Sequence, residues 1–199
     1  FVKWFKKKFS PGKFFRVLSK WQYNLPWNAN YFENHDQPRS VSRFIRGDKN
    51  HVKGAKSLAV LLMTLKGTPF IYQGQEIGMT NFDIDRIEYI RDVESHNIYE
   101  LACKLHFPKW YAWKMIRDTG RDNARTPMQW ALSKNAAFYL GYPCIKVNEN
   151  YREINVKSQI NDPQSILSLY TKLISLRKTN PVLIDGNFRK LKIFGSLFV

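Results

Sequence analysis

Two short strand-like segments, each following a segment with helical periodicity, constrain the fold of this chain more than any other feature. The first helix is predicted to begin after Ser10, an N-cap residue followed by proline, and its apolar face is formed by Phe14, Val17, Leu18 and Trp21. An aromatic strand is predicted at 27–33. A second helix is predicted at 51–66 and is ended by Gly67. Residues 68–72 are apolar throughout, which predicts a buried parallel strand. This alternation predicts an α/β fold in which helices cover a parallel sheet.

The second half of the chain is predicted to be less regular. A long excursion covers about 74–161, and one helix, around 109–118, is indicated within it. Excursions of this length in a compact domain usually carry function. A last helix is predicted to open at Asp162-Pro163 with Asp162 as its cap, and Arg177 near its C-terminus is expected to favour the helix dipole. Short alternating segments such as 191–194 then indicate further strands.

The composition is that of a folded chain, because 44% of its 199 residues are apolar and 15% are aromatic. The longest apolar run, at 58–63, is too short to cross a bilayer, and no signal-peptide pattern precedes it. We therefore expect a soluble, cytoplasmic protein without a membrane partner. The sequence begins with Phe1 rather than Met, which indicates a processed or partial sequence.

The net charge of +16 allows two interpretations. One is an anionic partner such as nucleic acid or a phosphorylated substrate. The other is that lysines solvate the outward faces of helices, or are balanced by acids in a missing part. The lysines are spread from Lys3 to Lys192 without a nucleic-acid-binding motif, which favours the second interpretation.

Cysteine and histidine spacing predicts neither a metal site nor a cofactor. Cys103 and Cys144 lack a CxxC spacing and do not form a disulfide framework. His51, His96 and His106 stand apart from one another and from any partner at ligand spacing. We expect reduced thiols, which fits an intracellular protein.

Two polar segments carry the candidate chemistry. His35-Asp36 ends the first strand, where a barrel enzyme presents polar groups to a substrate, although a surface turn would show the same pair. Residues 121–130 (RDNARTPMQW) combine two arginines with a tryptophan. Arginine donates in a planar fork and tryptophan offers a flat apolar face, which suits a sugar; a salt-bridged loop on the barrel rim is the alternative.

Five segments, in this order, resemble the α-amylase superfamily, specifically its branch of oligo-1,6-glucosidases, α-glucosidases and trehalose-6-phosphate hydrolases. They are FENHDQPR at 32–39, GTPFIYQGQEIGM at 67–79, RDVES at 91–95, RDNARTPMQW at 121–130 and VNENYREINV at 147–156. The resemblance implies a (β/α)8 TIM barrel, of which residues 1–183 would form the C-terminal portion. Residues 184–199 would then begin a small antiparallel β domain.

The resemblance also implies a chemistry, the retaining hydrolysis of α-glucosidic bonds in a small oligosaccharide or disaccharide. Asp36 matches the carboxylate that stabilises the transition state, and His35 and Arg121 match residues that bind the same glucose. Arg125 is expected to be a structural partner in its loop. The nucleophilic Asp and the acid Glu of the family come from earlier strands, so the isolated chain is expected to be inactive and to need the missing N-terminal part as its partner.

Other functions remain open at this stage. A transglucosylase or sucrose isomerase shares the arginine-rich loop, and a catalytically inactive relative could act as a binding partner, although the retained Asp36 argues against that. The chain also departs from the family pattern at Ala131, where a polar residue is frequent, at Ala137, where glycine is usual, and at Cys144, where tryptophan is usual. These changes are expected to affect loop packing more than the glucose pocket.

Overall fold

The computed structural model describes residues 2–5, 8–45, 47–190, 193–194 and 197–198, so the predicted strand residues Leu191 and Lys192 lie outside it. Its centre is a parallel pair of strands, β1 (Ala29–Tyr31) and β2 (Thr68–Phe70), with Ala29 opposite Thr68 and Tyr31 opposite Phe70. The prediction of a parallel α/β arrangement is confirmed. The prediction that the second strand is buried is wrong, because Phe70 is 53% exposed in a sheet where β2 has β1 as its neighbour.

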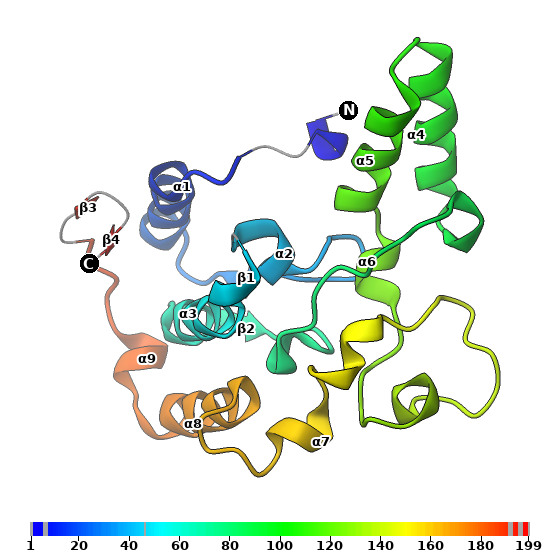
Figure 1. Ribbon diagram of the computed structural model, residues 1–199. Coiled ribbons are helices and arrows are strands. Elements are labelled where there is room, and N and C mark those ends of the chain that lie inside the picture. The colour runs from blue at the N-terminus through cyan, green and yellow to red at the C-terminus, as the bar shows by residue number, and fades with distance from the viewer. Residues whose placement is uncertain (1, 6–7, 46, 191–192, 195–196, 199) are drawn as a thin grey trace.

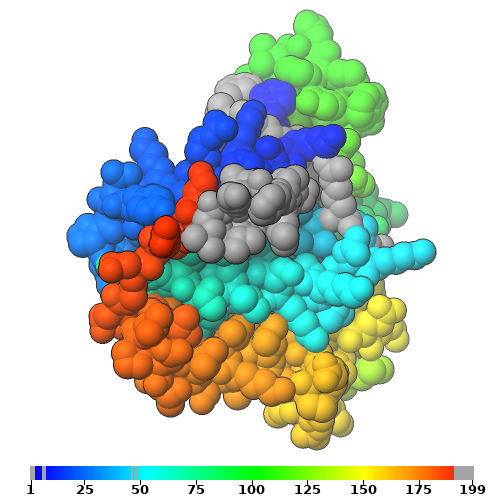
Figure 2. All heavy atoms as spheres, turned by 90° about the vertical axis from the view of Figure 1, so that its left-hand side faces the viewer, coloured from blue at the N-terminus to red at the C-terminus, as the bar shows by residue number. Residues whose placement is uncertain are grey.

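Three long helices lie beside the sheet: α1 (Pro11–Asn24), α3 (His51–Thr64) and α8 (Ile166–Thr179). Figure 2 shows them next to one another on one face of the molecule, in blue, teal and orange. The short helix α2 (Ser40–Phe44) leads into α3. The main core lies between α2, α3 and α8 and consists of Val41, Ala55, Ala59, Met63, Ile166, Tyr170 and Leu173. The sheet thus lies between these helices and the long excursion (Figure 1).

The predicted apolar face of α1 is wrong for Val17 and Trp21, whereas Phe14 and Leu18 are half-buried, and the start of the helix after Ser10 is confirmed. The helix buries Phe15, Ser19 and Gln22, whereas Val17 and Trp21 are each 55% exposed. The Gln22 side chain donates to the Lys66 carbonyl at 3.0 Å and accepts the Lys66 N–H at 3.1 Å. This pair of bonds to the turn before β2 fixes the rotation of α1, because backbone groups near a buried turn need partners.

The start of α8 also differs from the prediction. Its N-cap is Ser165, whose Oγ accepts the Ser168 N–H at 3.0 Å, and not Asp162. Asp162 instead accepts the Gln164 N–H through Oδ1 at 2.8 Å in the turn before the helix. A serine placed directly before the first helical residue satisfies a free amide of the first turn, which Asp162 is too far away to do.

Arg177 lies in the last turn of α8, as predicted, and its side chain also bonds to the end of a neighbouring helix. Its guanidinium is buried and donates to the carbonyls of Met63 and Leu65, at 2.8 and 3.0 Å, and to that of Gly67 at 2.5 Å. These carbonyls lie where α3 ends and the chain turns into β2. Burial lowers the pKa of the Arg177 guanidinium. Arg177 therefore closes the C-terminus of α3 and ties α8 to the start of β2.

The excursion is more helical than predicted. The predicted helix is confirmed as α5 (Lys109–Thr119), and a helix that was not predicted, α4 (Val93–Lys104), packs against it. The two helices project from the body of the molecule (Figure 1). A second apolar cluster joins the excursion to the N-terminal segment and contains Trp4, Phe82, Ile84, Ile90, Met115 and Ile116.

The remaining elements are short. Three further helices are α6 (Asp122–Arg125), α7 (Val156–Gln159) and α9 (Val182–Asp185). The 3-10 turns are Val2–Trp4, Asp48–Asn50, Gln75–Ile77, Ile87–Tyr89, Lys134–Ala137 and Glu149–Arg152. Near the C-terminus, β3 (Ile193–Phe194) pairs antiparallel with β4 (Leu197–Phe198). In the part of the chain that the structure describes, no helix combines the length and apolarity needed to span a membrane.

Residues 135–137 form a left-handed turn. Asn135, Ala136 and Ala137 have φ angles of 52°, 55° and 58°. The Ala136 carbonyl accepts the N–H groups of Trp130 and Ala131 at 2.9 and 3.1 Å. The turn is thus bonded to the end of the arginine-rich segment. Left-handed backbone costs an alanine roughly 1–2 kcal/mol because its Cβ crowds the following carbonyl.

We expect Arg177→Met to lower the free energy of unfolding by about 2–3 kcal/mol, because it removes the donor for three carbonyls at the end of α3. Urea unfolding of the chain measures the effect. The matched control is Lys178→Met, which changes an exposed cation on the same helix and should leave the midpoint almost unchanged. Equal midpoints for the two variants would contradict the role given to Arg177.

We expect Ala137→Gly to raise the free energy of unfolding by about 0.5–1 kcal/mol, because glycine adopts a positive φ without steric cost and Ala137 is exposed. The control is Ala112→Gly in the interior of α5, which should lower stability by about 1 kcal/mol or more. Thermal unfolding of both variants provides the measurement, and a destabilised Ala137→Gly variant would show that the turn carries no strain at this position.

Candidate active site

The segment Asn34-His35-Asp36-Gln37 forms a turn shortly after β1. The Asn34 side chain accepts the Asp36 N–H at 2.9 Å, and the Asn34 carbonyl accepts the Gln37 N–H at 3.3 Å. Asparagine favours such turns because its short side chain bonds the backbone two residues ahead. The turn holds the Asp36 carboxylate at the carboxyl end of a parallel strand, which is the end where barrel enzymes carry their active sites.

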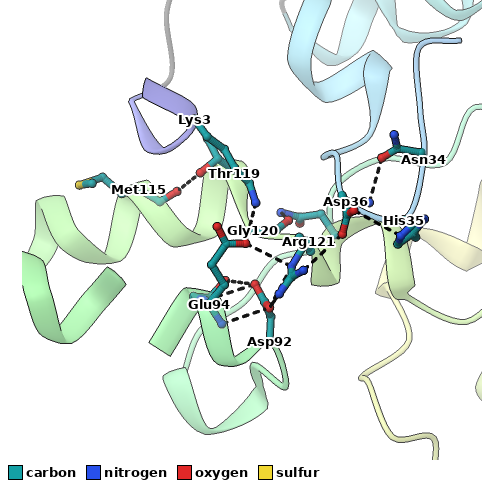
Figure 3. A network of polar contacts seen from close by, with 12 residues as sticks. Lys3, Asn34, His35, Asp36, Asp92, Glu94, Met115, Thr119, Gly120 and Arg121 are labelled. Atoms are coloured by element: carbon teal, nitrogen blue, oxygen red, sulfur yellow. Dashed lines mark hydrogen bonds and ion pairs between the residues drawn. The ribbon is translucent and has the colours of Figure 1, made fainter. Parts of the chain in front are cut away.

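Asp36 contacts three basic side chains, of which His35 and Arg121 are labelled in Figure 3. Its Oδ2 lies 3.2 Å from His35 Nε2, while its Oδ1 accepts Arg121 Nη1 at 3.3 Å and Arg125 Nη2 at 3.2 Å. Arg125 also donates through Nε to the His35 carbonyl at 3.0 Å. The structure therefore brings together Asp36, His35 and Arg121, the three residues singled out from the sequence. The side chains of His35 and Asp36 are 70% and 44% exposed, so a ligand can reach them.

Arg121 is held from its other side by two acids, Asp92 and Glu94, that were not predicted to belong to the site. Asp92 Oδ1 accepts Arg121 Nε at 3.0 Å and Nη2 at 2.5 Å, and Glu94 Oε2 lies 3.3 Å from Nε. Burial alone would raise the pKa of the Asp92 carboxyl, but hydrogen bonds from Arg121 and Ser95 outweigh burial and hold this pKa below its ordinary value. The bond to Asp92 in turn raises the pKa of the Arg121 guanidinium.

The segments carrying Asp92 and Arg121 bind each other in both directions. The Asp122 carboxylate accepts the N–H groups of Arg91 and Asp92 at 2.6 and 3.0 Å, while Asp92 accepts the Arg121 guanidinium. Asp92 is also the N-cap of α4. Asp92 and Arg121 are 29 positions apart, so no local pattern in the sequence predicts their contact. The one signal was that both residues lie in segments that resemble the family motifs.

A buried cation lies beneath the site. Arg39 is fully buried and donates to Glu33 Oε2 at 3.1 Å and to the Gln73 carbonyl at 2.6 Å. It also donates to the carbonyls of Asn123 and Ala124, each at 3.3 Å. Arg39 thereby ties the end of β1, the segment after β2 and helix α6 into one unit.

A cleft lies in another part of the molecule. This cleft, of about 790 Å³, is lined by residues of α2 and α7, by the starts of α3 and α8 and by the segments around Thr80 and Asn150, and Asp36 does not line it. Polar groups along this cleft bond to other parts of the chain, as Asn150 does to Thr80 at 2.7 Å and Gln159 to the Ile77 carbonyl at 2.9 Å. We therefore place the candidate site at Asp36.

The arrangement around Asp36 suits a polyhydroxyl ligand. An open carboxylate accepts hydroxyl protons, while guanidinium and imidazole groups donate to hydroxyl oxygens. The bonds to Asp92 and Asp36 use three of the five N–H groups of Arg121. Among the described residues, no group of three or more His, Cys, Asp or Glu side chains could hold a metal ion. Cys103 and Cys144 are free cysteines.

Known proteins with related sequences share this architecture. The family description "Alpha amylase, catalytic domain" matches residues 2–186 of the chain. The chain is 49% identical over 174 residues to an oligo-1,6-glucosidase of Halalkalibacterium halodurans, which covers 86% of the chain and 31% of that protein. It is 43% identical over 177 residues to a trehalose-6-phosphate hydrolase of Escherichia coli, covering 89% of the chain and 32% of that protein.

Solved structures agree with the sequence comparison. A mutant isomaltulose synthase of Erwinia rhapontici, in complex with its natural substrate sucrose, superposes with a TM-score of 0.90 at 38% identity, over 95% of this chain and 35% of that one. The chain thus spans about a third of the length of the curated relatives it matches. It belongs to the α-amylase family, in the branch of the oligo-1,6-glucosidases, and forms part of that family's TIM-barrel catalytic domain.

Proposed function

We propose that this chain supplies the transition-state-stabilising part of a retaining α-glucosidase that acts on short α-glucosides, as its relatives named oligo-1,6-glucosidases do. The observation that carries the proposal is the convergence of Asp36, His35 and Arg121 in an open site at the carboxyl end of β1. The similarity to a structure in complex with sucrose supports a small saccharide as the ligand.

In this mechanism Asp36 accepts hydrogen bonds from hydroxyl groups of the glucose whose bond is cleaved. The glucose becomes oxocarbenium-like and positively charged in the transition state, so a fixed carboxylate binds it more strongly there than in the ground state. His35 and Arg121 bind the same glucose. Arg125 donates to both the Asp36 carboxylate and the His35 carbonyl, and thereby fixes the two residues relative to each other.

The two reacting carboxyl groups are proposed to come from the preceding part of the barrel. One would attack the anomeric carbon and the other would protonate the leaving oxygen, at a separation of roughly 5–5.5 Å. This partner is supported by the apolar surface next to the strands: Tyr31 and Phe70 are each 53% exposed, as are large parts of Val17 and Trp21 on α1. Further strands and helices of a barrel would cover such a surface.

We expect the isolated chain to be inactive, because without the nucleophile no covalent glycosyl intermediate can form. Incubation with 4-nitrophenyl α-glucoside tests this. A cooperative urea transition of the same preparation shows that the chain is folded during the assay. Turnover well above the uncatalysed rate would contradict the division of the site between two parts of the enzyme.

We expect Asp36→Asn to reduce kcat by at least about 10²–10³-fold in a chimaeric enzyme, because it removes the negative charge that stabilises the transition state. In this enzyme the chain replaces the matching segment of the Halalkalibacterium halodurans oligo-1,6-glucosidase. The matched control is Asp162→Asn, at an exposed carboxylate before α8, which should retain full activity. Glucose release from isomaltose checks the hydrolytic function, whereas isomerisation of sucrose would identify a synthase instead.

A further inference from the structure

We propose that Asp92 is a positioning residue that sets the orientation of Arg121 in the active site. This inference rests on the proposed function and concerns a residue that acts through another side chain. Asp92 has a side chain that is 1% exposed, so it cannot itself bind a substrate, yet it makes the shortest contacts of Arg121.

The contact fixes which edge of the guanidinium faces the glucose site. Asp92 Oδ1 takes the Nε and Nη2 edge, so the third nitrogen, Nη1, is the one that reaches Asp36. A guanidinium is planar, so fixing two of its nitrogens fixes the direction of the third. Figure 3 shows Arg121 lying between Asp92 on one side and Asp36 on the other. Without Asp92, Arg121 could turn its fork toward Asp36 and occupy the carboxylate that the glucose needs.

Asp92 is itself held more firmly than an ordinary acid on a loop. Its Oδ1 accepts the Glu94 N–H at 3.3 Å, and its Oδ2 accepts the Ser95 N–H at 3.2 Å and Ser95 Oγ at 2.7 Å. Its own N–H is bonded to Asp122. The start of α4 therefore fixes Asp92, and Asp92 fixes Arg121.

Glu94 contributes less than Asp92 to the orientation of Arg121. It lies 3.3 Å from Arg121 Nε, but its side chain is 40% exposed and it also pairs with Lys3 at 2.8 Å. An exposed carboxylate that is shared between two cations and screened by water orients a partner weakly. The buried Asp92 contact is short and directed, so the orientation of Arg121 depends on Asp92.

The alternative is that Asp92 merely caps α4, and Asp92→Ser separates the two roles. Serine is a good N-cap, but its side chain is too short to reach Arg121. In the chimaeric enzyme we expect Asp92→Ser to lower kcat/KM about 10–100-fold on 4-nitrophenyl α-glucoside while α4 stays folded. The matched control is Ser165→Ala, which removes the N-cap of α8 far from Arg121 and should reduce stability without reducing kcat/KM.

A double-mutant cycle shows whether Asp92 acts through Arg121. In an Arg121→Met background, adding Asp92→Ser should change kcat/KM less than about threefold, because the side chain that it positions is gone. The same 10–100-fold loss in that background would overturn the inference, and so would full activity of the single variant. Inactivity of the unmutated chimaera would instead count against the proposed function.

An NMR measurement tests the inference even if the chimaeric enzyme is inactive. In the 199-residue chain the Arg121 Nε–H signal in a ¹⁵N NMR spectrum, assigned by its loss in Arg121→Met, should be protected from solvent exchange. We expect the protection to disappear in Asp92→Ser and to persist in Ser165→Ala. An equally protected signal in Asp92→Ser would overturn the inference, whatever the activity of the enzyme.

Discussion

The hydrogen bonds of the buried Arg39 guanidinium hold together the segments that form the candidate site. A cation without access to water must be surrounded by acceptors, and the structure supplies them from Glu33, from the segment after β2 and from α6. The most distant of these acceptors, the Ala124 carbonyl, lies 85 positions from Arg39 in the chain. Because Glu33 also accepts two hydrogen bonds from Ser40, the start of α2 is tied to the same centre. The turn carrying Asp36 and the helix carrying Arg125 are therefore both tied to Arg39 and cannot move independently.

Arginine has a structural role in this chain that lysine does not. Arg39 and Arg177 are buried and each donates hydrogen bonds to several backbone carbonyls, whereas none of the lysines that the structure describes is buried. The difference follows from chemistry, since a guanidinium spreads its charge over a planar fork while an ammonium group is compact and strongly hydrated. The strong positive charge of the sequence is therefore mostly a property of its surface, as the spread of lysines suggested.

Local patterns in the sequence predicted α3, α5 and the parallel strands, because periodicity and terminating residues are encoded within a few positions. They did not predict the rotation of α1 or the place of Arg177, since both depend on backbone carbonyls and amides contributed by other segments. The predicted site residues came from family motifs, and the structure places them together. Asp92 was missed because its role exists only once two motifs meet, and its capping position alone gives no hint of Arg121.

The open edges of the two-stranded sheet affect the solubility of the isolated chain. Among the described residues β1 and β2 pair only with each other, which leaves an outer edge of backbone donors and acceptors on each strand. Such edges are templates for pairing between copies, and the exposed Tyr31 and Phe70 beside them add apolar attraction. A net charge of +16 opposes the approach of like copies, and dissolved salt screens that repulsion. The solubility of this chain is thus a balance between open strand edges and surface lysines, and ionic strength shifts it toward association.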